Sequence, residues 1–135
     1  MSPRYLLDTN TVIYIRQRRP PAALAKFQAL PRGEAALSVI THGELVHGIE
    51  KSRDRPAGFA ALQELIGLIP VLPLPADTGE AYGDIRATLE RDGNVIGNND
   101  LWIAAHARVS GLILVSNNLR EFRRVARLQL ENWVA

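Results

Sequence analysis

The chain has 135 residues, about one domain's worth of sequence, and 47% of them are apolar, which suffices for one buried core. A charged fraction of 22% with a formal net charge of +2 is ordinary for a globular protein, and no apolar run approaches the ~18 residues of a membrane span. The lack of cysteine excludes disulfides, thiolate metal sites and a cysteine nucleophile, and the start of the chain has no signal-peptide pattern, so we expect a cytoplasmic protein.

Strand and helix patterns alternate along the chain. In chain order they predict a strand at 5–7, helices at 9–16 and 21–30, a strand at 35–39, helices at 41–52 and 56–69, a strand at 71–74, helices at 77–91 and 99–110, a strand at 112–115, a helix at 119–125 and a strand at 128–130. This alternation indicates an α/β fold with helices on both faces of a mostly parallel central sheet. Ligands of such sheets bind beyond the carboxyl ends of the strands.

Arginine carries almost all of the positive charge, since only Lys26 and Lys51 among the sixteen cations are lysines. The planar guanidinium group binds two phosphate oxygens at once, so clustered arginines suit nucleic acid. The candidates for phosphate contacts near the two ends of the chain are Arg16, Arg18, Arg19, Arg120, Arg123 and Arg124. A solvated surface explains clusters of this size equally well, so charge alone does not assign the partner.

Three acidic residues fall where the predicted strands end or the next helices begin. Each has a structural explanation: Asp8 as a helix N-cap, Glu44 as the partner of Thr41 in a capping box, and Asp100 as a favourable charge in a first helical turn. Together on one rim, however, three carboxylates repel one another unless a cation lies between them. Oxygen ligands suit Mg²⁺ or Mn²⁺, which indicates a metal-dependent phosphotransfer site.

The three histidines do not extend this set into a zinc site. His42 and His47 are five residues apart and so do not share a helix face. We expect His106 to pack or cap within its own helix.

Four segments carry a more specific signal. Tyr5–Asn10 reads YLLDTN, Thr41–Gly48 reads THGELVHG, Gly97–Ala107 reads GNNDLWIAAHA, and Leu114–Phe122 reads LVSNNLREF and is followed by ENW at 131–133. In this order and spacing they resemble the motifs of PIN-domain nucleases of the VapC toxin type. The resemblance covers essentially the whole chain and implies a single PIN domain over residues 1–135, with a three-layer α/β/α sandwich.

The resemblance also implies roles for particular residues. Asp8 and Asp100 would be the principal metal ligands, and Glu44 would complete the catalytic acidic cluster. Thr9 and Ser116 would orient metal-bound water. The polar side chains expected to support the cluster are Thr9, Asn10, Ser116, Asn118 and Glu121. Asn10 is expected to brace the Asp8 turn, although a simple capping role explains it as well.

The chain departs from the family pattern at the fourth acidic position. Many PIN domains have an aspartate shortly after the last core strand, where this chain has Asn118. An amide is a neutral and weaker ligand, so the number of metal ions stays open. Glu121 is near enough to replace the missing acid, or else it pairs with Arg120 or Arg124.

The implied activity is hydrolysis of an RNA phosphodiester by a metal-bound water. The implied substrate is a structured RNA, most simply a tRNA, with initiator tRNA included. The implied partners are a VapB-type antitoxin that covers the cleft and a second copy of the chain, giving a homodimer and a toxin–antitoxin hetero-oligomer without any membrane association.

Two alternatives have different chemistry. The run Asp8–Val12 is similar to the nucleophile motif of haloacid-dehalogenase enzymes, but these enzymes and receiver domains also need a lysine after a later core strand, which this chain lacks. The other alternative is a catalytically silent RNA- or protein-binding module whose acids are helix caps, and Asn118 is its best support.

Overall fold

A single parallel sheet organises the structure, a computed structural model that describes residues 2–134. Its strands are β1 (Tyr5–Leu7), β2 (Ala35–Ser38), β3 (Val71–Leu72), β4 (Ile113–Val115) and β5 (Leu130–Glu131). They are arranged in the order β3-β2-β1-β4-β5, and every pairing is parallel. The predicted parallel sheet is therefore confirmed.

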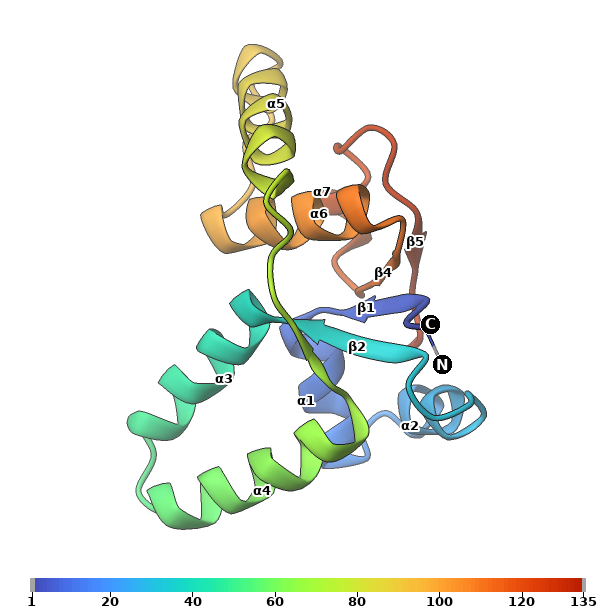
Figure 1. Ribbon diagram of the computed structural model, residues 1–135, viewed down its shortest axis with the longest axis vertical. Coiled ribbons are helices and arrows are strands. Elements are labelled where there is room, and N and C mark those ends of the chain that lie inside the picture. The colour runs from blue at the N-terminus through green and yellow to red at the C-terminus, as the bar shows by residue number, and fades with distance from the viewer. Residues whose placement is uncertain (1, 135) are drawn as a thin grey trace.

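Helices cover both faces of this sheet (Figure 1). On one face lie α1 (Thr9–Gln17), α2 (Pro21–Gln28), α3 (Val39–Glu50) and α4 (Arg55–Leu68). On the other face lie α5 (Thr78–Arg91), α6 (Asn98–Ser110) and the short α7 (Leu119–Phe122). The three-layer α/β/α architecture expected from the sequence is the observed one.

The central strand β1 divides the core into two clusters. Tyr5 and Leu7 pack with α1–α4, whereas Leu6, between them, packs with α5–α7. All three are buried, as is Leu114 on the neighbouring strand β4. Strands buried on both faces are apolar throughout rather than alternating, which explains the continuous apolar runs in the sequence.

The start of α3 differs from the prediction. The N-cap is Ser38, whose Oγ accepts a hydrogen bond from the Ile40 N–H at 3.1 Å, so α3 begins before the predicted cap at Thr41. The Thr41 hydroxyl is buried, and its oxygen has no hydrogen-bond partner within residues 2–134. The capping box given as the structural explanation of Glu44 is therefore not formed, and Glu44 lies in the second turn, away from the helix terminus.

The other boundaries differ from the prediction by a few residues at most. Asp77 is the N-cap of α5, but its side chain makes no capping hydrogen bond. Gly111 ends α6 in the left-handed conformation at φ 65°, which glycine adopts without steric cost. Over residues 2–134, no helix combines the length and apolarity needed to cross a membrane.

Replacing Leu114 with alanine tests the burial of the sheet. Leu114 is fully buried, so Leu114→Ala should lower the free energy of unfolding by about 2–5 kcal/mol through lost burial and a residual cavity. The matched control is Leu68→Ala, since Leu68 is 50% exposed and should cost less than about 1 kcal/mol. Urea unfolding of both variants measures the difference, and equal losses would contradict the assigned core.

Candidate active site

The carboxyl ends of three neighbouring strands meet at one rim of the sheet. Because β1 lies between β2 and β4, the residues that follow these strands are brought together. Asp8 follows β1, Ser116 follows β4, and α3 with Glu44 follows β2. The chain reverses its direction across the sheet between β1 and β4, which is where ligands bind in open parallel sheets.

Asp8 is held rigidly in this rim. Its carboxylate caps α1 by accepting a hydrogen bond from the Thr11 N–H at 2.9 Å, and the Thr11 hydroxyl donates to the Val115 carbonyl at 3.2 Å. Burial raises the pKa of Asp8, hydrogen bonds from Ser116 and Thr11 lower it, and the charge of Glu44 raises it further, with a net upward shift. Asp8 is therefore both a helix cap and a member of the acidic cluster.

Thr9 connects α1 to α3. Its hydroxyl donates a short hydrogen bond to the Glu44 carboxylate, although the two residues are 35 positions apart. Asn10, the next residue, is exposed. The contacts that brace the Asp8 turn come from Thr11, which was not among the predicted site residues. The one sequence signal for it is its position three residues after the Asp8 cap.

Asp100 lies in the first turn of α6 and is half-buried. Burial is the main cause that raises its pKa to about 6, followed by the charges of Glu121, Asp8 and Glu44. Since three other carboxylates raise the pKa of Asp100, all four lie close enough to interact electrostatically. The structure thus brings together all three acids predicted to be catalytic, and Glu121 with them.

A short polar chain joins the end of β4 to α7. The Ser116 Oγ accepts from the Asn118 N–H at 2.9 Å, and the Asn118 side-chain amide donates to Glu121 Oε2 at 3.1 Å. None of the ion pairs within residues 2–134 joins Glu121 to Arg120 or Arg124. Asn118 therefore orients Glu121, whose charge is the largest influence after burial on the raised pKa of Asp100.

The chemistry of this donor set fits a hard divalent cation. Its four carboxylates are the oxygen donors that such a cation prefers, and the pKa values of Asp8 and Asp100 are raised by burial first and by neighbouring carboxylates as well. Within the described residues, no three acidic or histidine side chains converge closely enough to chelate an ion as they stand. Binding would therefore require these side chains to draw together.

The candidate arginines have different surroundings. Arg16 lines a cavity of about 390 Å³ between α1, α3 and α4, together with Thr9 and Glu44. Four others are exposed, namely Arg18, Arg19, Arg120 and Arg123. Arg124 instead donates to the carbonyls of Asn94 and Val95 at 3.4 and 3.3 Å, and so braces the segment before α6.

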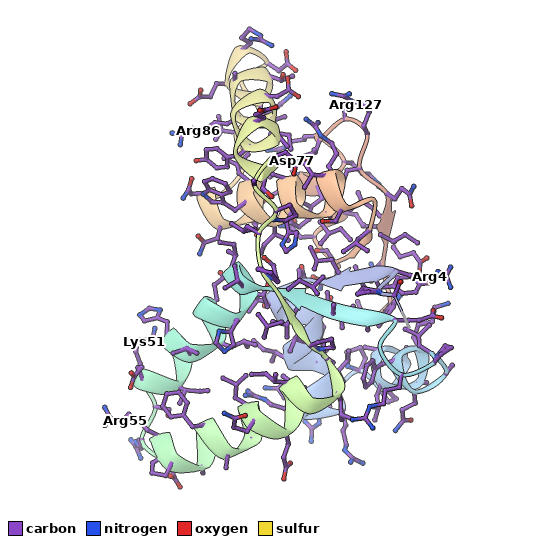
Figure 2. All side chains as sticks on the ribbon, in the orientation of Figure 1. Arg4, Lys51, Arg55, Asp77, Arg86 and Arg127 are labelled. Carbon is purple, nitrogen blue, oxygen red and sulfur yellow. The ribbon has the colours of Figure 1, made fainter. Side chains whose placement is uncertain are left out.

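Other cations lie on both sides of the sheet. Lys51 and Arg55 lie at the turn between α3 and α4, whereas Arg86 and Arg127 lie on the α5–α6 side (Figure 2). Arg127 and Arg108 pair with Asp84 at 3.6 and 2.6 Å. The positive charge is therefore distributed around the molecule and is partly engaged in ion pairs.

Comparison with known proteins agrees with this geometry. The PIN domain family matches residues 5–128. Ribonuclease VapC2 of Haemophilus influenzae is 45% identical over 131 residues, which are 97% of this chain and 98% of the relative. The tRNA(fMet)-specific endonuclease VapC of Shigella flexneri is 38% identical over 130 residues, 96% of this chain and 98% of the relative.

Solved structures give the same result. DNA-bound VapBC from Salmonella typhimurium matches with a TM-score of 0.90 and 36% identity, covering 97% of this chain and 98% of that chain. VapBC2 from Rickettsia felis, bound to a promoter DNA fragment, matches with a TM-score of 0.89 and 34% identity over 98% of this chain and 99% of that chain. This chain therefore belongs to the PIN-domain family, among its VapC ribonucleases.

Proposed function

We propose that this chain is a Mg²⁺- or Mn²⁺-dependent endoribonuclease toxin that hydrolyses a phosphodiester bond of tRNA. The observation that carries the proposal is the acidic cluster at the rim of the sheet, where burial and then the charges of Glu121, Asp8 and Glu44 raise the pKa of Asp100. Repulsive carboxylates lower the stability of a metal-free fold, and such charges concentrate at functional sites. A cation would relieve the repulsion and supply the chemistry.

The residues divide into ligands and orienting groups. Asp8, Glu44 and Asp100 would hold the ion, and Glu121 would take the place of the fourth acid, because its charge, unlike the Asn118 amide, acts on Asp100. When bound, the ion supplies a water of lowered pKa and stabilises the leaving oxygen. Thr9 holds the Glu44 carboxylate, and Ser116 lowers the pKa of Asp8 against the larger effect of burial.

The substrate and partners are proposed from the relatives. VapC proteins of Shigella flexneri and Salmonella typhimurium are named tRNA(fMet)-specific endonucleases, so initiator tRNA is the first substrate to test. The exposed arginines would contact its phosphates. Matching structures are VapBC complexes, which supports a VapB-type antitoxin as partner. We further propose that the chain forms a homodimer and a toxin–antitoxin hetero-oligomer in the cytoplasm.

A silent binding module is the second candidate. Two observations favour it: the absence of a ready-made three-ligand set within residues 2–134, and the amide of Asn118 at the fourth position. In that case the acids would only cap and orient helices. Cation binding separates the two candidates, because a silent module has no reason to bind Mn²⁺ through Asp8 and Asp100.

Cleavage of purified tRNA with Mg²⁺ or Mn²⁺ tests the activity. Asp8→Asn and Asp100→Asn should each reduce the rate by on the order of 100-fold, because each removes a charge that the transition state needs. The control is Asp77→Asn, an exposed N-cap residue of α5 that makes no capping bond, and it should cleave like the wild type. Undiminished cleavage by both cluster variants would mean that the activity lies elsewhere.

Thermal unfolding with Mn²⁺ tests the ligand set separately from the substrate. Millimolar Mn²⁺ should raise the Tm of the wild type, because a ligand that binds only the folded state stabilises it. The same concentration should shift the Tm of Asp8→Asn much less, and that of Asp77→Asn as much as the wild type. A wild-type Tm that does not respond to Mn²⁺ would favour the silent module.

Because the pKa of Asp100 is raised, replacing this carboxylate with a neutral side chain should increase stability in a pH-dependent way. Its pKa is 3.8 in the unfolded chain and about 6 in the folded protein, so the folded state binds more protons between these values and the free energy of unfolding falls as the pH rises through them. Metal-free Asp100→Asn should therefore be more stable than the wild type at pH 7. Denaturant unfolding should show that this advantage disappears below pH 4, and a variant less stable at pH 7 would contradict the assignment.

A further inference from the structure

A buried hydrogen bond lies behind the acidic cluster and has no part in the chemistry proposed above. His106 Nδ1 and Ser38 Oγ are 2.8 Å apart, and the two residues are 1% and 0% exposed. His106 is packed in the core, as expected, but it does not cap its own helix, because its hydrogen-bond partner is 68 positions away. Within residues 2–134 this is the one side-chain hydrogen bond between α6 and the start of α3.

The bond joins the two helices that carry Asp100 and Glu44. His106 is six residues after Asp100 on α6, and Ser38 is six residues before Glu44, so each acid lies about 9 Å along its helix from the bond. Small rotations of either helix about this point would therefore change the separation of the two acids.

At the rim itself there is open space beside α3 and the start of α6. A cavity of about 300 Å³ lies between them, lined by Val39, Ile40, Gly43, Glu44, His47 and Asn99. Val39 is 40% exposed, as expected for a residue beside open space. Ile40 of α3 packs against the core cluster that contains the buried residues of α6, and the buried hydrogen bond adds the directional contact between the two helices.

We propose that His106 and Ser38 are positioning residues that hold Glu44 and Asp100 at the spacing needed to share a divalent cation. This inference rests on the proposed function, since it concerns the same acidic cluster. Ser38 acts through two contacts at once: its Oγ accepts from Ile40 and thereby starts α3, and its hydroxyl hydrogen is available for His106 Nδ1. This arrangement requires the tautomer with the ring proton on Nε2, which leaves Nδ1 free to accept.

The environment of His106 supports a neutral ring in this role. Burial lowers the pKa of His106, so the imidazole is uncharged at neutral pH and a hydroxyl is a sufficient partner. A fixed, uncharged contact of this kind adds rigidity and leaves the negative charge of the cluster to be balanced by the cation.

The test compares variants that remove or preserve the bond. His106→Leu removes the ring nitrogen and replaces the imidazole with an apolar side chain of similar bulk. His106→Asn instead offers an amide atom near the position of Nδ1. Leu89→Ala is the control for lost stability, because Leu89 is buried in α5, away from the contact between α3 and α6. Mn²⁺ affinity is measured by calorimetry at a temperature where each variant is folded, and kcat and KM are measured on tRNA.

We expect His106→Leu to weaken Mn²⁺ binding and to lower kcat, each by on the order of 10-fold, with KM for tRNA unchanged, as for other residues that orient metal ligands. His106→Asn should restore most of both. Leu89→Ala should lower the Tm without changing the Mn²⁺ affinity. A folded His106→Leu that binds Mn²⁺ as tightly as the wild type would overturn the inference and leave the bond as a stabilising contact alone.

If His106→Leu does not fold, Ser38→Ala gives the same test by removing the other partner of the hydrogen bond. It should also weaken Mn²⁺ binding, and wild-type affinity in this variant would again reject the positioning role. Failure of the wild type to bind Mn²⁺ would instead overturn the proposed function, and the inference with it. The two failures are therefore distinguishable.

Discussion

The parallel pairing of β1 between β2 and β4 is the constraint on which the site depends. Each of these strands is fully or nearly fully buried, so the register of the sheet is fixed by core packing on both faces. The residues that follow the strands consequently meet at one rim. Asp8, the start of α3 and Ser116 are neighbours because their strands are neighbours, although more than one hundred residues separate the first from the last.

The acidic cluster opposes the stability that the sheet provides. Asp8 is buried with its charge only partly offset by hydrogen bonds from Ser116 and Thr11, and Asp100 is affected by three like charges. A sequence selected for stability alone would place fewer carboxylates here. This conflict between local electrostatics and the rest of the fold is typical of functional sites, where a bound partner supplies the missing interaction.

Much of this arrangement follows from the sequence, and the remainder depends on contacts that no local pattern contains. The alternation of apolar runs with helical patterns predicts the layers and the rim, and the acids at the strand ends predict the cluster. The Thr9–Glu44 and His106–Ser38 hydrogen bonds join residues 35 and 68 positions apart, so their partners become visible only in three dimensions. The predicted first residue of α3 is wrong for a related reason. Ser38 and Thr41 are both good N-cap residues, and local propensity does not choose between them.

The choice of Ser38 has a consequence for Glu44. A cap at Thr41 would have placed Glu44 in the first turn, where its carboxylate could accept a hydrogen bond from the backbone N–H of Thr41. That capping role would have been a sufficient explanation for an acid at this position. With the cap at Ser38, backbone hydrogen bonding within the helix no longer requires that carboxylate. Its partner is instead the Thr9 hydroxyl, on the helix that Asp8 caps. The same serine that begins α3 thus releases Glu44 from a capping role and, through His106, joins its helix to the one that carries Asp100.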